Sequence, residues 1–225
     1  MSAQLLVAPD GLRGFDCDCA LTAETAADAF AKGYRFAYRY VARRVEGPND
    51  LTASEVEVIL GAGLAVGVVQ HVPSEESWTP TAAVGAMYGT NAATLAAAAA
   101  GLPAGAFVFC DLEGVAEGCS HADVIAYCRA WCDAVAAGGF KLGLYVGWHC
   151  DLSPDELYAL PFTAYWGAYN LDRDQEPASR GLQMKQHPST GFPKIEGLPE
   201  YDVNIVHTDA KGDRPLMYAP DAWPA

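Results

Sequence analysis

The sequence predicts an α/β protein built as a single (β/α)8 barrel of the TIM type, degenerate in its second half. Short apolar, β-prone runs alternate with helical segments, which is typical of parallel βαβ units. Eight strand candidates in a chain of 225 residues favour a closed barrel over an open doubly wound sheet. The open sheet is the alternative, but no Gly-x-Gly-x-x-Gly motif or phosphate-binding loop opens a helix. No linker divides residues 1–225, so we expect one domain.

The first half of the chain gives the clearest alternation. Thr52 followed by Glu55 forms a capping-box pattern, and glycines end the helix that follows. The run at 106–114 is continuously apolar before it reaches its acids, as in a strand buried on both faces. The expected strands are 14–16, 35–41, 64–72 and 106–114, and the expected helices begin at residues 22, 51, 79 and 120.

The second half is less regular. Ser153 and Pro154 mark an N-cap and a first helical position, which predicts a short helix to residue 160. Between the last strands, helices are poor or missing. The expected strands are 141–148, 164–169, 181–187 and 201–206.

The charge of the chain excludes some classes of partner. A net charge of −14 leaves no basic stripe for nucleic acid and gives no help in approaching an anionic membrane or cell wall. No run of about 20 apolar residues predicts a membrane span. The start lacks a basic region and a long apolar run, so we expect no secretory signal. We therefore expect a monomer made in the cytoplasm and exported by a non-classical route or as a phage component.

The seven cysteines do not suggest a metal site. No Cys-x-x-Cys pair or His-x-x-x-His cluster is present, so we expect no metal and no cofactor. An odd number leaves at least one thiol unpaired. Most of them fit small buried side chains of a protein made in a reducing compartment.

The strand that ends in Asp111-Leu112-Glu113 is the strongest candidate for chemistry. Residues two apart in a strand point to the same side, with Cα atoms roughly 7 Å apart. Two neighbouring carboxyls cannot both ionise at their ordinary pKa values. We expect Glu113 to have the raised pKa and Asp111 to stay ionised, which would separate acid and base roles as in glycoside hydrolysis. The alternative is that Glu113 caps the next helix and Asp111 forms a loop salt bridge.

Other polar and aromatic residues also stand at predicted strand ends, where the site of a parallel barrel lies. Carboxylates transfer protons, and aromatic faces stack on sugar rings. Each residue alone also fits a cap or core packing, but four acids converging on one rim do not. The set comprises Asp16, Arg39, Tyr40, Gln70, His71, Asp111, Glu113, Tyr145, Trp148, Trp166, Tyr169, Gln186, His187, Asp202 and Asn204. We expect Trp166 or Tyr145 to face the cleft.

Several of these segments together resemble a known family. Gly14-Phe15-Asp16, Phe36-Ala37-Tyr38-Arg39-Tyr40, the helix at Leu51-Thr52…Glu55 and Asp111-Leu112-Glu113 resemble bacterial and phage glycoside-hydrolase-like domains. These domains are similar to the family-25 glycoside hydrolases, the muramidase-type lysozymes. The resemblance covers nearly the whole chain and implies a barrel.

The resemblance also implies roles for residues. It makes Glu113 the general acid, and Asp111 the residue that stabilises an oxocarbenium or orients the N-acetyl group of the substrate. Asp16 and Asp202 would line the site. Gln186 resembles a glutamine that lies between Trp and Tyr in the lysozymes, although its neighbours here are Lys185 and His187. Arg39, Tyr40, Tyr145, Trp166 and Gln186 are the expected substrate-binding residues.

Three functions compete at this point. The first is a glycosidase that cuts peptidoglycan, or another polysaccharide, beside N-acetylmuramic acid. The second is a catalytically silent carbohydrate- or cell-wall-binding domain, or a phage or effector structural domain, on the same fold. The third is an amidase or other hydrolase that uses the same acids.

Overall fold

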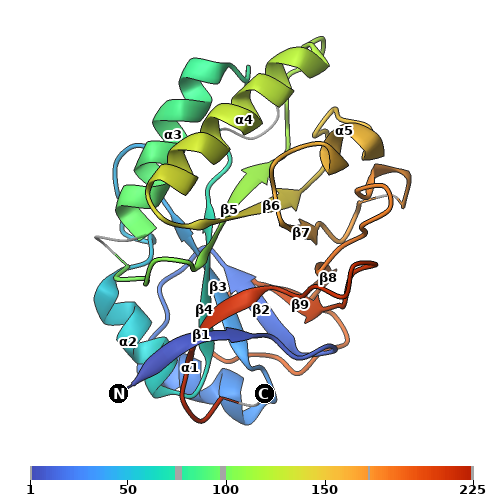
Figure 1. The fold of residues 1–225 in the computed structure, drawn as a ribbon. Coiled ribbons are helices and arrows are strands. Elements are labelled where there is room, and N and C mark those ends of the chain that lie inside the picture. Colours follow the sequence, from blue (N-terminus) through green and yellow to red (C-terminus); the bar gives the residue numbers. More distant parts are fainter. Residues whose placement is uncertain (1, 74–77, 97–99, 172, 224–225) are drawn as a thin grey trace.

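The computed structural model describes residues 2–73, 78–96, 100–171 and 173–223 as one ten-stranded sheet with helices outside it (Figure 1). The strands are β1 (Ala3–Val7), β2 (Arg13–Cys17), β3 (Phe36–Val41), β4 (Ala65–Gln70), β5 (Phe107–Leu112), β6 (Lys141–Val146), β7 (Ala164–Gly167), β8 (Met184–Pro188), β9 (Asp202–Val206) and β10 (Leu216–Pro220). The helices are α1 (Ala23–Ala31), α2 (Ala53–Gly61), α3 (Ala82–Thr94), α4 (His121–Ala137), α5 (Pro154–Tyr158) and the 3₁₀ turn η2 (Arg173–Gln175).

Eight strands close into a barrel, as the sequence predicts. From β2 to β8, each strand pairs in parallel with the next one along the chain. Strand β9 then closes the ring, because it pairs with both β8 and β2. Threonine or serine side chains cap the N-termini of α1 to α5, close to the expected helix starts. The helix expected from residue 79 begins later, at Ala82.

The barrel departs from a regular (β/α)8 barrel in one strand and in the missing helices. Strand β9 runs antiparallel to both neighbours. An antiparallel return needs no crossover helix, and among the described residues none lies between β8 and β9. Residues 189–201 therefore stay at the carboxyl end of β8. The start of β9 lies at the same rim as the ends of the parallel strands.

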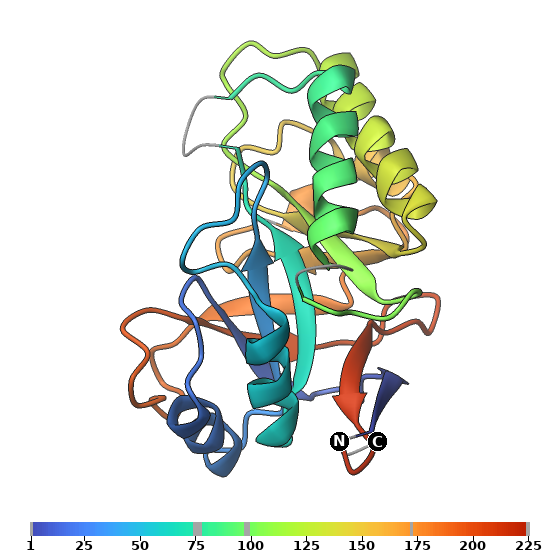
Figure 2. The same ribbon diagram turned by 90° about the vertical axis from the view of Figure 1, so that its left-hand side faces the viewer.

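The antiparallel pair of strands β1 and β10 was not predicted from the sequence. The two strands pair antiparallel over their full length, and β10 joins β4 through Tyr218 and Val66. Figure 2 shows this pair of strands beside the barrel. Its strands are short and come from opposite ends of the chain, so no local turn pattern connects them in the sequence.

The helices cover the barrel in two groups. Figures 1 and 2 show α3 and α4 side by side over one part of the barrel, and α1 with α2 over another. Gly85 and Gly89 allow α3 to approach α4 closely, because a Cβ there would lie 2.2 Å from the Tyr127 carbonyl and 2.5 Å from the Trp131 carbonyl. None of the described helices is long and apolar enough to cross a bilayer.

The interior of the barrel is filled by aromatic rings that face glycines. Tyr38 lies opposite Gly67 on the neighbouring strand, and Phe109 lies opposite Gly143. A Cβ at Gly67 would come within 2.4 Å of the Tyr38 ring, and one at Gly143 within 2.6 Å of the Phe109 ring. The rings therefore occupy the space that a side chain on the next strand would need, and they form a solid core beneath the rim.

We predict that Gly67→Ala lowers the free energy of unfolding by about 1–3 kcal/mol, because the added methyl group overpacks the Tyr38 ring. Chemical denaturation measures this. The control is Gly61→Ala in the exposed last turn of α2, where nothing lies within 4 Å of the new Cβ. That variant should be unchanged or stabilised by up to about 1 kcal/mol. Equal stability of wild type and Gly67→Ala would contradict the overpacking argument.

Candidate functional site

Four acids meet at the rim formed by the carboxyl ends of the parallel strands. Asp16 lies near the end of β2, Asp111 near the end of β5 and Glu113 directly after β5. Asp202 begins the antiparallel β9, and it lies opposite Asp16 in the β2–β9 register. The charges of all four acids raise the pKa of Tyr145, after burial, which places the acids around one point. The structure therefore brings the four acids named from the sequence to one rim of the barrel.

Asp16 is buried and fully engaged by hydrogen bonds. Asn204 donates from Nδ2 at 2.8 Å, Gln186 from Nε2 at 3.2 Å and Tyr40 from its hydroxyl at 3.3 Å. Burial nevertheless raises the pKa of Asp16 to about 7, and the nearby charge of Asp202 adds to this, although the hydrogen bonds oppose it. A carboxyl with this pKa is about half protonated at neutral pH.

Asp111 is enclosed more completely than the sequence suggests. Burial raises its pKa well above the ordinary range, and the charges of Glu113 and Asp16 raise it further. A hydrogen bond from the backbone N–H of Val72 and the charge of Arg43 work in the opposite direction. The expectation that Asp111 stays ionised runs against this direction, because its position inside the barrel mouth removes water from the charged form.

Glu113 is half-buried and lies over a glycine. A Cβ at Gly147 would approach Oε2 of Glu113 to 2.2 Å and its Cβ to 2.5 Å, so only glycine leaves room for this carboxylate. The backbone of Glu113 is held by the buried Trp78, whose indole Nε1 donates to its carbonyl at 2.8 Å. Trp78 was not predicted as a site residue, because its loop gives no periodic signal.

A chain of hydrogen bonds connects two of the expected substrate-binding residues to Asp16. The hydroxyl of Tyr145 donates to Oε1 of Gln186 at 3.0 Å. This leaves Nε2 of Gln186 to donate to Asp16 and fixes the orientation of the amide. Tyr145, Gln186 and Tyr40 thus lie at the acid cluster, as the sequence predicts.

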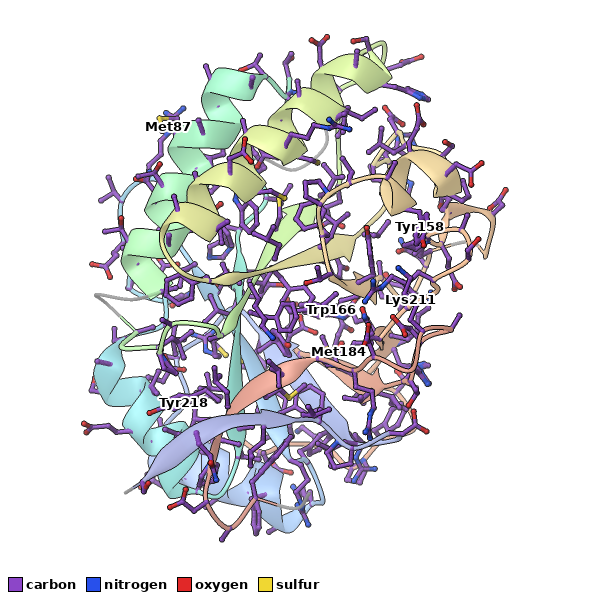
Figure 3. The ribbon with its side chains drawn as sticks, viewed as in Figure 1. Met87, Tyr158, Trp166, Met184, Lys211 and Tyr218 are labelled. Carbon is purple, nitrogen blue, oxygen red and sulfur yellow. The ribbon has the colours of Figure 1, made fainter. Side chains whose placement is uncertain are left out.

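Trp166 does not lie in a cleft. Its side chain is fully buried, and its ring contacts those of Tyr38, Phe109 and Tyr145 at 5.1, 6.0 and 4.7 Å between centroids. Figure 3 shows Trp166 in the middle of the barrel beside Met184 of the next strand. Trp166 is therefore not the one of the two expected aromatic residues that could face the cleft, and its expected role in substrate binding is wrong, because an indole in the core has no face open to a ligand.

Arg39 is also fully buried and does not reach the acid cluster. Its Nε lies 2.7 Å from Oε1 of Glu55 on α2, and its terminal nitrogens donate to the carbonyls of Cys17 and Asn49. The side chain therefore points outward from β3 and ties the barrel wall to α2 and a loop. Its predicted role in substrate binding is wrong for this reason.

The exposed aromatic groups of the rim are Trp148 and Tyr169. Their side chains are 46% and 52% exposed. Tyr169 lines a cavity of about 540 Å³ together with Asp16, Tyr40, Tyr201 and Asp202. This volume lies in the ordinary range of small-molecule pockets, about 300–1,000 Å³.

The other candidates at strand ends have structural contacts. Gln70 is buried, where it accepts from Trp131 Nε1 at 2.8 Å and donates to the carbonyls of Tyr88 and Ala42.

All seven cysteines are free. Within the described ranges, no group of three or more His, Cys, Asp or Glu side chains could hold a metal ion.

A closed barrel with carboxyls clustered at one rim is compatible with a glycoside-hydrolase-like domain. The family model described as "Rv2525c-like, glycoside hydrolase-like domain" matches residues 27–206. The chain belongs to this family, and the predicted resemblance is confirmed.

Solved structures of similar fold include muramidases and family 25 enzymes. A muramidase from Trichobolus zukalii has a TM-score of 0.61 at 13% identity, covering 87% of this chain and 93% of that one. A family 25 glycosyl hydrolase from Bacillus anthracis has a TM-score of 0.54 at 15% identity, covering 87% and 88%. An uncharacterized B. stearothermophilus protein has 0.57 at 20% identity, covering 87% and 96%. At these identities the likeness establishes the fold. No curated protein matches the chain.

We predict that stability falls as pH rises from about 4 to 7. The folded pKa of Asp16, about 7, lies above its unfolded value, so the folded state keeps a proton that the unfolded state releases in this window. The stabilisation is fully present below the unfolded pKa and is lost as pH rises through 7, by at most about 1.4 kcal/mol per pH unit for this group. Asp16→Asn should flatten the slope measured by urea denaturation, whereas Asp155→Asn at an exposed site should not. Identical slopes for wild type and Asp16→Asn would contradict the assignment.

Proposed function

We propose that this protein is a glycoside hydrolase that cleaves the glycan strands of cell-wall peptidoglycan in the manner of a muramidase. The observation that carries the proposal is the acid cluster: Asp111 and Glu113 end one strand, and Asp16 and Asp202 approach from two others. Glycosidic bonds are cleaved by paired carboxyls of this kind. The muramidase fold of the structural neighbours supports the same reading.

Glu113 is the proposed general acid. Its side chain is half-buried at the rim and open to a bound glycan, whereas the carboxyl of Asp111 is enclosed. Because the charge of Glu113 raises the pKa of Asp111, the pair keeps one proton at a pH where two isolated carboxyls would have lost both. When a glycan excludes water from the rim, the pair can deliver this proton to the glycosidic oxygen through Glu113.

Asp111 becomes charged once the pair has given up its proton. A carboxylate in this position stabilises the positive charge that develops on the sugar, or orients the N-acetyl group that does so. Asp16 and Asp202 line the adjoining cavity with Tyr40. Gln186 and Tyr145 hold Asp16 in place and thereby shape the floor of the site.

The second candidate is a domain that binds a polysaccharide without cleaving it. One observation favours it: Asp111 Oδ1 is buried and has no hydrogen-bond partner among the described residues, so this carboxyl is closed to a substrate in the free protein. Under either function we propose a single-domain monomer. Delivery to the wall by a non-classical route or as a phage component is part of the proposal, because the polymer lies outside the cell.

We predict that Glu113→Gln lowers turnover of purified peptidoglycan by about 10²–10⁴-fold, because the amide keeps the shape of the side chain but cannot supply the proton. Mass spectrometry of released muropeptides measures the product. The matched control is Glu117→Gln, four residues further along the same loop and exposed to solvent, which should keep wild-type activity. Activity that survives Glu113→Gln would remove the role assigned to Glu113. A wild type that binds but never cleaves would establish the second candidate.

A second variant tests the position of the carboxylate rather than its chemistry. Gly147→Ala places a methyl group where Oε2 of Glu113 lies, so the acid must move although it is still present. We expect turnover to fall by about 10²-fold for a displacement of about 1 Å, with little change in KM. The same muropeptide assay measures it, and circular dichroism checks the fold. Unchanged turnover would show that Glu113 does not act from the position seen here.

A further inference from the structure

A second cavity opens beside the acid cluster, at the carboxyl ends of β3 and β4. Its volume is about 670 Å³. The residues that line it come from the segment after β3, the segment after β4 and helix α3. They are Ala42, Arg43, Arg44, Val45, Gly47, Asp50, His71, Val72, Pro73 and Tyr88. His71 is one of the candidates at strand ends, but none of the expected catalytic or substrate-binding residues is in this lining.

Two neighbouring arginines line the cavity, in a chain with 14 lysines and arginines against 28 acids. Arg44 is exposed, with its guanidinium 5.7 Å from the centroid of the Tyr88 ring, and Arg43 is half-buried. Within the described ranges, which omit 74–77, neither arginine lies within 4.0 Å of a carboxylate.

The one carboxylate in the lining is already engaged. Asp50 Oδ2 accepts from the backbone N–H of Gly47 at 2.5 Å, and its Oδ1 lies 3.3 Å from Nε2 of His71. Burial lowers the pKa of His71, so this ring adds no positive charge at neutral pH. Among the described residues, the lining therefore has two cations and one carboxylate, which is the reverse of the charge balance of the chain.

This cavity adjoins the acid cluster through two contacts. The His71 ring stacks on Tyr40 at 4.6 Å between centroids, and the hydroxyl of Tyr40 donates to Asp16. The backbone of Val72, a lining residue, donates to Asp111. The charge of Arg43 also reaches Asp111. The cavity therefore borders the acid cluster at the same rim of the barrel.

We propose that this cavity is an anion subsite, in which Arg43 and Arg44 bind a carboxylate carried by the glycan substrate. The inference rests on the proposed function and adds to it the chemical class of the bound substituent. A chain with a net charge of −14 repels an anionic polymer, so binding one requires local cations near the reacting bond. Guanidinium groups suit this purpose, because they bind carboxylates through two parallel hydrogen bonds and stay charged.

The carboxylate has two sources in peptidoglycan. It is the lactyl group of muramic acid where the stem peptide is absent, and the free carboxylates of the stem peptide where it is present. The test measures binding of three tetrasaccharides to the Glu113→Gln protein by titration calorimetry, so that turnover does not interfere. The first probe is the neutral N-acetylglucosamine tetramer, the second alternates N-acetylglucosamine and N-acetylmuramic acid without peptide, and the third carries stem peptides.

We expect the carboxylate-bearing probes to bind more tightly than the neutral one. Adding Arg43→Gln and Arg44→Gln should weaken their binding by about 10- to 100-fold, the effect of losing hydrogen bonds to a charged group, and should leave the neutral probe unchanged. Of the two carboxylate-bearing probes, the one that loses more affinity identifies the source of the carboxylate. Lysine at both positions should restore part of the affinity, and this part should weaken with salt. Arg129→Gln, on the exposed face of α4, is the matched control and should have no effect.

Several outcomes overturn the inference. Equal binding of the carboxylate-bearing probes before and after the arginine substitutions would do so, as would an equal loss for all three probes. Glu113-dependent hydrolysis of purified peptidoglycan is measured separately with the wild-type protein, so the proposed function can stand while the subsite fails. Absence of binding by every probe overturns both. Thermal unfolding by circular dichroism verifies that each variant is folded.

Discussion

The packing of aromatic rings against glycines inside the barrel is the constraint on which the rest of the structure depends. Tyr38 and Phe109 occupy the space above glycines of the neighbouring strands, and Trp166 fills the middle between them. Tyr145 stands on Trp166, and its hydroxyl leads through Gln186 to the carboxyl cluster. The acids thus lie on top of a tightly packed, buried layer of aromatic rings. This layer is the physical reason why burial is the largest cause of the raised pKa values of Asp16 and Asp111.

Much of the barrel could be predicted from the sequence, because each strand from β2 to β6 is a short apolar run followed by a capped helix. The direction of β9 could not, since a strand reads the same in either direction. That reversal brings Asp202 opposite Asp16. The acids themselves were recognisable because carboxyls at the ends of apolar strands oppose burial. Their proton balance was not, because it depends on how deeply each one lies in the barrel mouth.

Side-chain direction explains the two expected binding residues that lie elsewhere. Tyr38 and Tyr40 face the barrel interior and the rim, so the residue between them must point outward, and Arg39 does so. The alternation was present in the sequence, and it outweighs closeness to a strand end. Trp166 faces inward too, but its depth depends on the packing of neighbouring strands. An inward-facing aromatic residue is part of the barrel core unless it lies in the layer of side chains nearest the rim.

The close approach of Glu113 to Gly147 has a consequence for relatives of this chain. A relative can preserve every carboxyl of the cluster while a single methyl group at the glycine position displaces the Glu113 carboxylate from the position seen here. The acids alone are therefore an incomplete description of this rim when relatives are compared. The residue that faces the acid, although it bears no functional group, carries the missing information. A comparison of relatives should therefore consider the glutamate and the facing glycine together.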